Sequence, residues 1–155
     1  MNIRRAKLSD ARELASLYTQ FWDAHKKVDP LIKLTNKDQE KEDLRYAKSA
    51  LRKKDTFVFI ALEGAKIIGY IELFIKKNEP YYKVKKYGYL DSAVVDKKHR
   101  GKGVTRLLTE SAFNFLKKTG IDYIKTNVYN ANDVAMKVWE KIGFEPLSVN
   151  MIKKI

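Results

Sequence analysis

The chain has 155 residues, 45% of them hydrophobic and 12% aromatic, which is typical of one soluble globular domain that we place at residues 1–155. The absence of cysteine excludes disulfides, thiolate metal sites and a cysteine nucleophile, and we expect no bound metal. Because no apolar run is long enough to span a bilayer and no signal peptide is apparent, we expect a cytoplasmic protein. The formal net charge of +13 favours anionic ligands.

The N-terminal third is predicted to be mainly helical. After a short extended start around Ile3, Asp10 and Glu13 have the spacing of a capping box, where a helix should begin. An apolar stripe carries this helix to about His25. A second, more polar helix is predicted over residues 37–53.

The middle of the chain is predicted to form strands. Two β-rich runs over residues 56–62 and 66–75 are joined by residues 63–65, which are typical of a hairpin turn. A loop rich in lysine and tyrosine follows over residues 76–86, and strand character returns over residues 87–95.

The remaining part alternates helices and strands. A helix over residues 103–119 is expected to bury Leu107 on its apolar stripe. Strands over residues 121–129 and 144–152 are predicted on either side of a helix over residues 132–142. Such alternation implies neighbouring parallel strands, so the fold class is α/β.

One segment, from Val94 to Leu108, carries the clearest chemical signal. Strand residues lead through a cationic turn with two glycines directly into a helix, so backbone N–H groups point into one concavity. The basic side chains around the turn are Lys97, Lys98, Arg100, Lys102 and Arg106. This arrangement favours a multiply charged ligand such as a pyrophosphate.

Two motifs resemble those of the GCN5-related N-acetyltransferase (GNAT) superfamily. Residues 100–104, Arg-Gly-Lys-Gly-Val, are similar to the family's acetyl-coenzyme A loop. Asn132, Ala135, Trp139 and the pair at 143–144, Gly-Phe, are similar to its C-terminal motif. The resemblance implies a central mixed sheet flanked by about four helices, with the fourth and fifth strands splayed to form the coenzyme slot.

The resemblance assigns acetyl-CoA as cosubstrate. It places the pyrophosphate against the amides of residues 101–106, and pantetheine between the main chain of residues 93–95 and a wall that includes Asn132. The Val95 N–H would polarise the thioester carbonyl. Asn132 could equally be a helix N-cap, and both roles are compatible. The assigned coenzyme residues are Ala93, Val94, Val95, Arg100, Gly101, Lys102, Gly103, Val104, Thr105, Arg106, Asn132 and Ala135.

The implied reaction is transfer of the acetyl group to a primary amine by direct attack in a ternary complex. Asp91 stands four residues before Val95, on the same side if the strand is regular, where polyamine acetyltransferases of the superfamily carry a general-base Glu. Asp91 is therefore the candidate base, acting through a water relay, and the alternative is an Asp that pairs with a lysine. Trp139 stands where the family usually has a proton-donating Tyr. Tyr129 is the substitute candidate, unless it is a core residue.

The acceptor is expected to lie against the first two helices, and it could be a small amine, a polyamine-like amine or a peptide amine. Trp22 and Glu72 are the candidate acceptor-lining residues, although Trp22 could belong to the core and Glu72 could face solvent. A homodimer formed through the last strand is a further expectation left open.

Two other functions compete with acetyl transfer. A basic nucleic-acid or ribosome-binding module is suggested by the lysines and tyrosines over residues 76–87. Because the lysines are spread through both halves of the chain, a coenzyme-attracting surface is the simpler account, and nucleic acid is not the expected partner. An inactive acetyl-CoA sensor is suggested by Trp139.

Overall fold

The structure, a computed structural model, describes residues 1–32 and 38–155. Its centre is a five-stranded sheet in the order β1-β2-β3-β4-β5. The strands are β1 (Asn2–Arg5), β2 (Thr56–Glu63), β3 (Lys66–Lys77), β4 (Lys86–Val95) and β5 (Ile124–Thr126). The first four strands pair antiparallel, and β5 pairs parallel with β4. The predicted mixed sheet is therefore confirmed.

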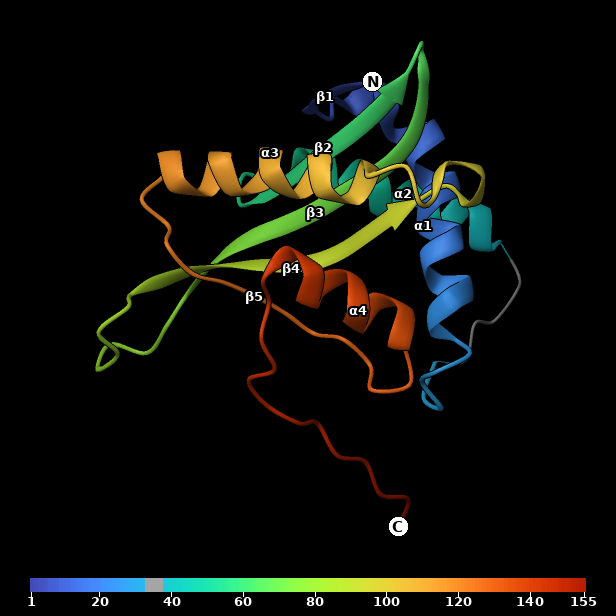
Figure 1. Cartoon of the computed structure of the whole chain (residues 1–155). Helices are drawn as coiled ribbons and strands as arrows, with labels where there is room; N and C mark the ends of the chain where they lie inside the picture. Colours follow the sequence, from blue (N-terminus) through green and yellow to red (C-terminus); the bar gives the residue numbers. More distant parts are fainter. Residues whose placement is uncertain (33–37) are drawn as a thin grey trace.

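Helices cover both faces of the sheet (Figure 1). The helices are α1 (Ala11–His25), α2 (Gln39–Arg52), α3 (Val104–Lys118) and α4 (Asp133–Ile142), with short 3-10 turns η1 (Leu8–Asp10) and η2 (Lys97–His99). Side chains of α1 and α2 share one apolar core with Tyr70 of β3, while α3 and Trp139 of α4 share another with Ile71. Alternate strand residues thus face opposite helical layers.

The start of α1 differs from the predicted capping box. The Asp10 carboxylate forms an ion pair with Arg4, with Nη1 and Oδ2 at 2.7 Å, and also accepts the Lys7 N–H at 2.7 Å. Glu13 instead accepts the Ile67 N–H of β3 at 2.6 Å. The predicted Asp10–Glu13 box was wrong because both carboxylates find partners in neighbouring strands and turns.

The C-terminal half contains less strand than predicted. β5 has three residues instead of nine, because it pairs with β4 only from Gly88 to Leu90. The strand predicted over residues 144–152 does not form. Although its apolar residues alternate, no long strand edge lies beside it, and Leu147 and Val149 are exposed. Figure 1 shows this segment running away from the sheet.

The apolar stripe of α3 is narrower than predicted. Val104, Leu108, Ala112 and Leu116, spaced four residues apart, are buried against the sheet. Leu107 lies beside this row and keeps 40% of its surface exposed, so its predicted burial was wrong. None of the described helices has the length and apolar character needed to cross a bilayer.

Candidate functional site

The turn before α3 presents backbone amides. Gly101 and Gly103 have φ of +75° and +77°, a left-handed conformation that glycine adopts at little cost. The Leu107 N–H donates to the Gly103 carbonyl at 3.2 Å. The amides of residues 104–106 precede this bond and therefore point out of the helix end. A Cβ atom at either glycine would meet no atom within 4 Å, so the space outside the turn can admit a ligand.

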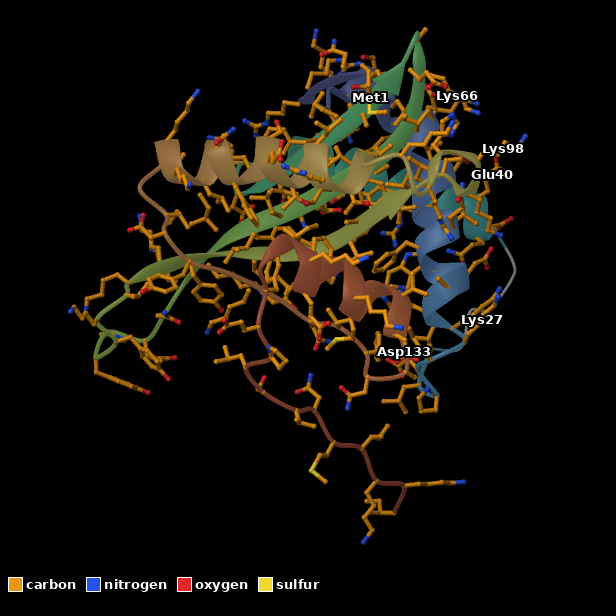
Figure 2. The ribbon with its side chains drawn as sticks, in the orientation of Figure 1. Met1, Lys27, Glu40, Lys66, Lys98 and Asp133 are labelled. Carbon is orange, nitrogen blue, oxygen red and sulfur yellow. The ribbon has the colours of Figure 1, made fainter. Side chains whose placement is uncertain are left out.

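Side chains anchor this turn on both sides. The Val104 side chain is buried in the α3 core. The His99 ring is also buried, and its two nitrogens lie 3.1 Å from carboxylate oxygens of Asp96 and Glu63. Asp96 in addition accepts the Lys98 N–H at 3.0 Å. The turn is thereby tied to the β2–β3 hairpin, and Figure 2 shows Lys98 and Lys66 at the same end of the molecule.

The basic residues of the turn do not all point in one direction. The Arg100 Nε donates to the Val95 carbonyl at 3.0 Å, so its guanidinium joins the turn to the end of β4. The Arg106 Nε pairs with Glu110 at 2.8 Å. Lys102 is exposed, and Thr105 uses its carbonyl to accept the Thr109 hydroxyl. Of the three basic coenzyme candidates, Arg100, Lys102 and Arg106, Lys102 is thus the one whose side chain is not held by a hydrogen bond to another described residue.

The fourth and fifth strands diverge beside this turn. β4 continues to Val95, whereas its pairing with β5 ends at Leu90 and Thr126. The Asp96 N–H bonds to Ile68 of the β3 side at 2.9 Å. Because main-chain groups alternate in direction along a strand, the N–H groups of Val95 and Ala93 point to the open side. The Val94 side chain, in contrast, is buried in the α1 core.

The start of α4 forms the other side of the divergence. The Asn132 Oδ1 accepts the Ala135 N–H at 3.1 Å, so Asn132 caps the helix. Its amide group keeps the Nδ2 donor for another partner. The Ala135 N–H is committed to this cap.

Glu72 is buried on the face of β3 that α1 and α2 cover. Its carboxylate accepts the Tyr18 hydroxyl at 2.5 Å and the half-buried Tyr46 hydroxyl at 3.3 Å. Burial raises the pKa of Glu72 to about 7, although both hydrogen bonds lower it. Glu72 therefore does not face solvent, and the hydroxyls of Tyr18 and Tyr46 cover its carboxylate.

Asp91 lies at an irregularity of β4. Glu72 pairs with Ser92 and Leu73 pairs with Leu90, which leaves Asp91 as the extra residue of a bulge. The groups that interact with its charge, which include Glu72 and Tyr46, belong to the α1–α2 face. The prediction that Asp91 and Val95 share one side was wrong, because the bulge breaks the alternation between them.

The Asp91 side chain is exposed, yet the protein around it restricts hydration and raises its pKa. The Lys76 ammonium acts in the opposite direction. A carboxylate with this environment can accept a proton more readily than a free aspartate.

Three residues named from the sequence remain to be placed: Trp22, Tyr129 and Trp139. Trp22 is partly buried and packs edge-on against Phe21, with ring centroids 5.2 Å apart. The Tyr129 hydroxyl donates to Asp29, which raises the Tyr129 pKa to about 12. Trp139 is buried and packs against Phe144 at 5.4 Å. Trp139 is thus a core residue.

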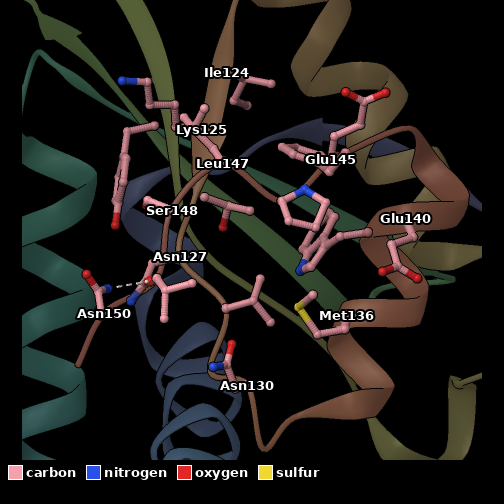
Figure 3. A pocket seen from close by; sticks show the side chains of 17 residues that line it. Ile124, Lys125, Asn127, Asn130, Met136, Glu140, Glu145, Leu147, Ser148 and Asn150 are labelled. Carbon is pink, nitrogen blue, oxygen red and sulfur yellow. Dashed lines mark hydrogen bonds between the residues drawn. The ribbon is translucent and has the colours of Figure 1, made fainter. Parts of the chain in front are cut away.

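A cleft of about 450 Å³ opens between β5, α4 and the C-terminal segment (Figure 3). Met136 and Trp139 line it, and Asn150 donates to Asn127 across it at 3.1 Å. None of the residues of the turn, 100–106, belongs to this lining. The cleft is therefore distinct from the concavity at the start of α3.

Sequence analysis missed two residues of the α1–α2 face, Tyr46 and Lys76. Tyr46 lies in the second predicted helix, outside its predicted apolar stripe, and its partner Glu72 is 26 residues away in sequence. Lys76 was one of many lysines in a loop. No local pattern distinguishes these residues, because only the packing of helices on the sheet brings them together.

Comparison with known proteins gives one family. The model of the "Acetyltransferase (GNAT) family" matches residues 13–144. N-alpha-acetyltransferase 30 of Schizosaccharomyces pombe is 25% identical over 122 residues, which cover 78% of this chain and 79% of that protein.

Solved structures share the fold. A variant of the BH1408 protein of Bacillus halodurans superposes with a TM-score of 0.88 at 24% identity, covering 100% of this chain and 99% of that one. A predicted acetyltransferase of Clostridium acetobutylicum, solved with acetyl-CoA, gives a TM-score of 0.77 at 22% identity, with 99% and 95% covered.

Proposed function

Because the chain belongs to the GNAT family of acetyltransferases, we propose that it transfers the acetyl group of acetyl-CoA to a primary amine by direct attack in a ternary complex. The observation that supports this most strongly is the amide-lined turn, which opens beside the free end of β4 on the same sheet as Asp91. The proton-accepting carboxylate and the anion-binding amides thus lie on β4 and on the turn that follows it.

The turn would hold the coenzyme through its backbone. The amides of residues 101–106 suit a pyrophosphate, since they combine free donors with the positive end of the α3 dipole. The open main-chain donors of Ala93 and Val95 suit pantetheine and the thioester carbonyl. The free Nδ2 of Asn132 adds a donor on the opposite wall.

The acceptor amine must lose a proton before or during attack. The carboxylate of Asp91, with its raised pKa, would take that proton through a water molecule, because Asp91 and Val95 face opposite sides of the strand. The amine nitrogen then forms a bond with the acetyl carbon, and the bond from that carbon to sulfur breaks. The coenzyme leaves as a thiolate, whose pKa near 8.5 makes departure feasible without an acid. Tyr129 would be a weak proton donor to this thiolate, because its hydroxyl donates to Asp29 and its pKa is raised to about 12.

A thiol-release assay with acetyl-CoA and a panel of amines, amino acids, aminoglycosides and peptides tests this proposal. We expect one acceptor class to release thiol, and Asp91→Asn to lower kcat by about 10²-fold or more. The melting shift caused by acetyl-CoA should be unchanged in Asp91→Asn. Asp122→Asn, a substitution at an exposed site, is the matched control, and Tyr129→Phe reports on the proton donor.

The same assay distinguishes acetyl transfer from a second candidate function. The burial of Trp139 in the core, where an indole supplies no acidic proton, favours a catalytically inactive acetyl-CoA-binding protein. That function predicts a melting shift with acetyl-CoA and no acetylated product from any amine.

For the acetyl-transfer proposal, unchanged turnover in Asp91→Asn would reject Asp91 as the base.

A further inference from the structure

One alkylammonium group, that of Lys76, already lies near Asp91 on the α1–α2 face, where the acceptor is expected. The Lys76 Nζ lies 3.6 Å from the centroid of the Tyr89 ring, a distance at which the ring face attracts a cation. Lys76 and Tyr89 belong to neighbouring strands and lie near the bulge that carries Asp91. The positive charge of Lys76 also stabilises the Asp91 carboxylate and therefore lowers the pKa of that carboxyl.

The charged groups near Asp91 come from β3, from β5 and from the residue that follows α2. Glu72 on β3 is the other carboxyl, and Lys53 after α2 lies near enough to lower the Glu72 pKa. Because its pKa is raised to about 7, Glu72 is only partly ionised near neutral pH. Lys125 of β5 pairs in register with Tyr89 and has its Nζ 4.5 Å from the centroid of the Tyr87 ring. The other titratable groups that interact with Asp91 are the hydroxyls of Tyr46, Tyr70 and Tyr89.

We infer that Tyr89 and Asp91 form a subsite for a primary alkylammonium group, and that the Lys76 ammonium occupies this subsite until an acceptor displaces it. This inference rests on the proposed function and narrows its acceptor class. An acceptor with one positive charge exchanges for the Lys76 ammonium without changing the net charge of the subsite. A second cation on the acceptor adds repulsion from the displaced Lys76, so a singly charged amine is favoured over a diamine.

The chain offers a matched control for this site. Lys77 is the next residue of β3, is exposed like Lys76, and by strand alternation points to the opposite face. Lys76→Met and Lys77→Met change the net charge equally. A difference between them is therefore a local effect, and Lys76→Arg keeps the charge in place.

The test is carbon NMR of the aspartate carboxyl groups in the full chain, with Asp91→Asn used to assign the Asp91 signal. In Lys76→Met we expect the Asp91 pKa to rise, whereas Lys77→Met and Lys76→Arg should match the wild type. Titration with n-butylamine and 1,4-diaminobutane then follows the same signal. Lys76→Met should bind the diamine up to about fivefold more tightly, and Lys77→Met should not.

Equal behaviour of Lys76→Met and Lys77→Met, in either the pH titration or the amine titrations, would overturn the subsite. An Asp91 signal that neither amine moves in any variant would also overturn it. Neither result depends on turnover. A missing melting shift with acetyl-CoA would instead count against the proposed function and leave the subsite standing.

Discussion

Glu72 carries a carboxyl group in a position that solvent does not reach. Its side chain is fully buried beneath Tyr18 and Tyr46, and burial raises its pKa from 4.5 to about 7. A carboxyl with a raised pKa binds its proton more tightly in the folded chain than in the unfolded chain. Glu72 therefore makes the free energy of unfolding depend on pH.

The free energy of unfolding is expected to fall as pH rises from 4.5 to about 7, because over this range the folded state holds a proton that the unfolded state has lost. The contribution of Glu72 is up to about 3 kcal/mol. Glu72→Gln is neutral at every pH and lacks this contribution. Melting temperatures at pH 5 and pH 8 should therefore fall more for the wild type than for Glu72→Gln.

Glu79→Gln, at an exposed position of the β3–β4 loop, is the control and should follow the wild type. Parallel melting curves for Glu72→Gln and the wild type would show that the buried carboxyl keeps an ordinary pKa.

Gly103 is the residue on which the amide-lined turn depends most. It is the N-cap of α3 with φ of +77°, and an alanine there costs about 1–2 kcal/mol. Its Cβ would also project into the open space proposed for the pyrophosphate. We expect Gly103→Ala to lower the melting temperature and to reduce the melting shift caused by acetyl-CoA.

Gly120 separates these two effects. It follows the other end of α3 and has φ of +75°, so Gly120→Ala should cost similar stability while retaining the full response to acetyl-CoA. If both variants responded alike to acetyl-CoA, the turn at Gly103 would have no part in coenzyme binding.

At the scale of the element, α4 depends on one side chain at its start. The Asn132 Oδ1 caps the Ala135 N–H, and loss of such a cap costs about 1 kcal/mol. Asn132→Ala should therefore lose stability, and Asn132→Ser should restore it, because serine is also a good N-cap. Serine lacks the Nδ2 donor, so Asn132→Ser should still bind acetyl-CoA more weakly.

Thermal melting with and without acetyl-CoA measures both properties. A full acetyl-CoA response in Asn132→Ser would assign Asn132 to the cap alone. This comparison decides between two roles that the spacing of the motif leaves open.

At the scale of the whole molecule, the net charge of +13 acts on any anionic partner. The β3–β4 hairpin projects from the sheet (Figure 1) and carries Tyr81 with 82% of its surface exposed, among lysines. Basic residues also surround the turn at the start of α3. The two surfaces belong to different ends of the β3–β4 pair and suit different anions.

We expect the affinity for acetyl-CoA to fall roughly several-fold between about 50 and 300 mM salt, because salt screens the attraction between the basic residues and the anionic coenzyme. Fluorescence or calorimetric titration at the two salt concentrations measures this. A short single-stranded RNA should leave the melting temperature unmoved at physiological salt. RNA binding with a steep salt dependence, without a response to acetyl-CoA, would favour the nucleic-acid function instead.

The amide-lined turn could be predicted because its parts are contiguous in the sequence. Strand, glycine turn and helix follow one another between Val94 and Leu108, and the left-handed backbone at Gly101 and Gly103 is a local property that glycine provides. The order of the helices and of the first five strands followed from hydrophobic periodicity, whereas the mixed sheet was expected from the resemblance to the GNAT superfamily.

The arrangement of charged groups on the α1–α2 face depends on contacts between residues that are far apart in the sequence. The side on which Asp91 lies is set by the register of β3 against β4, because a bulge of one residue reverses the alternation of side chains. The exposure of residues 147–152 likewise depends on the length of β5. By itself the sequence determined the local backbone that can hold an anion, whereas the tertiary structure alone decided which carboxyls and cations meet opposite it, since those groups are joined only by packing across the sheet.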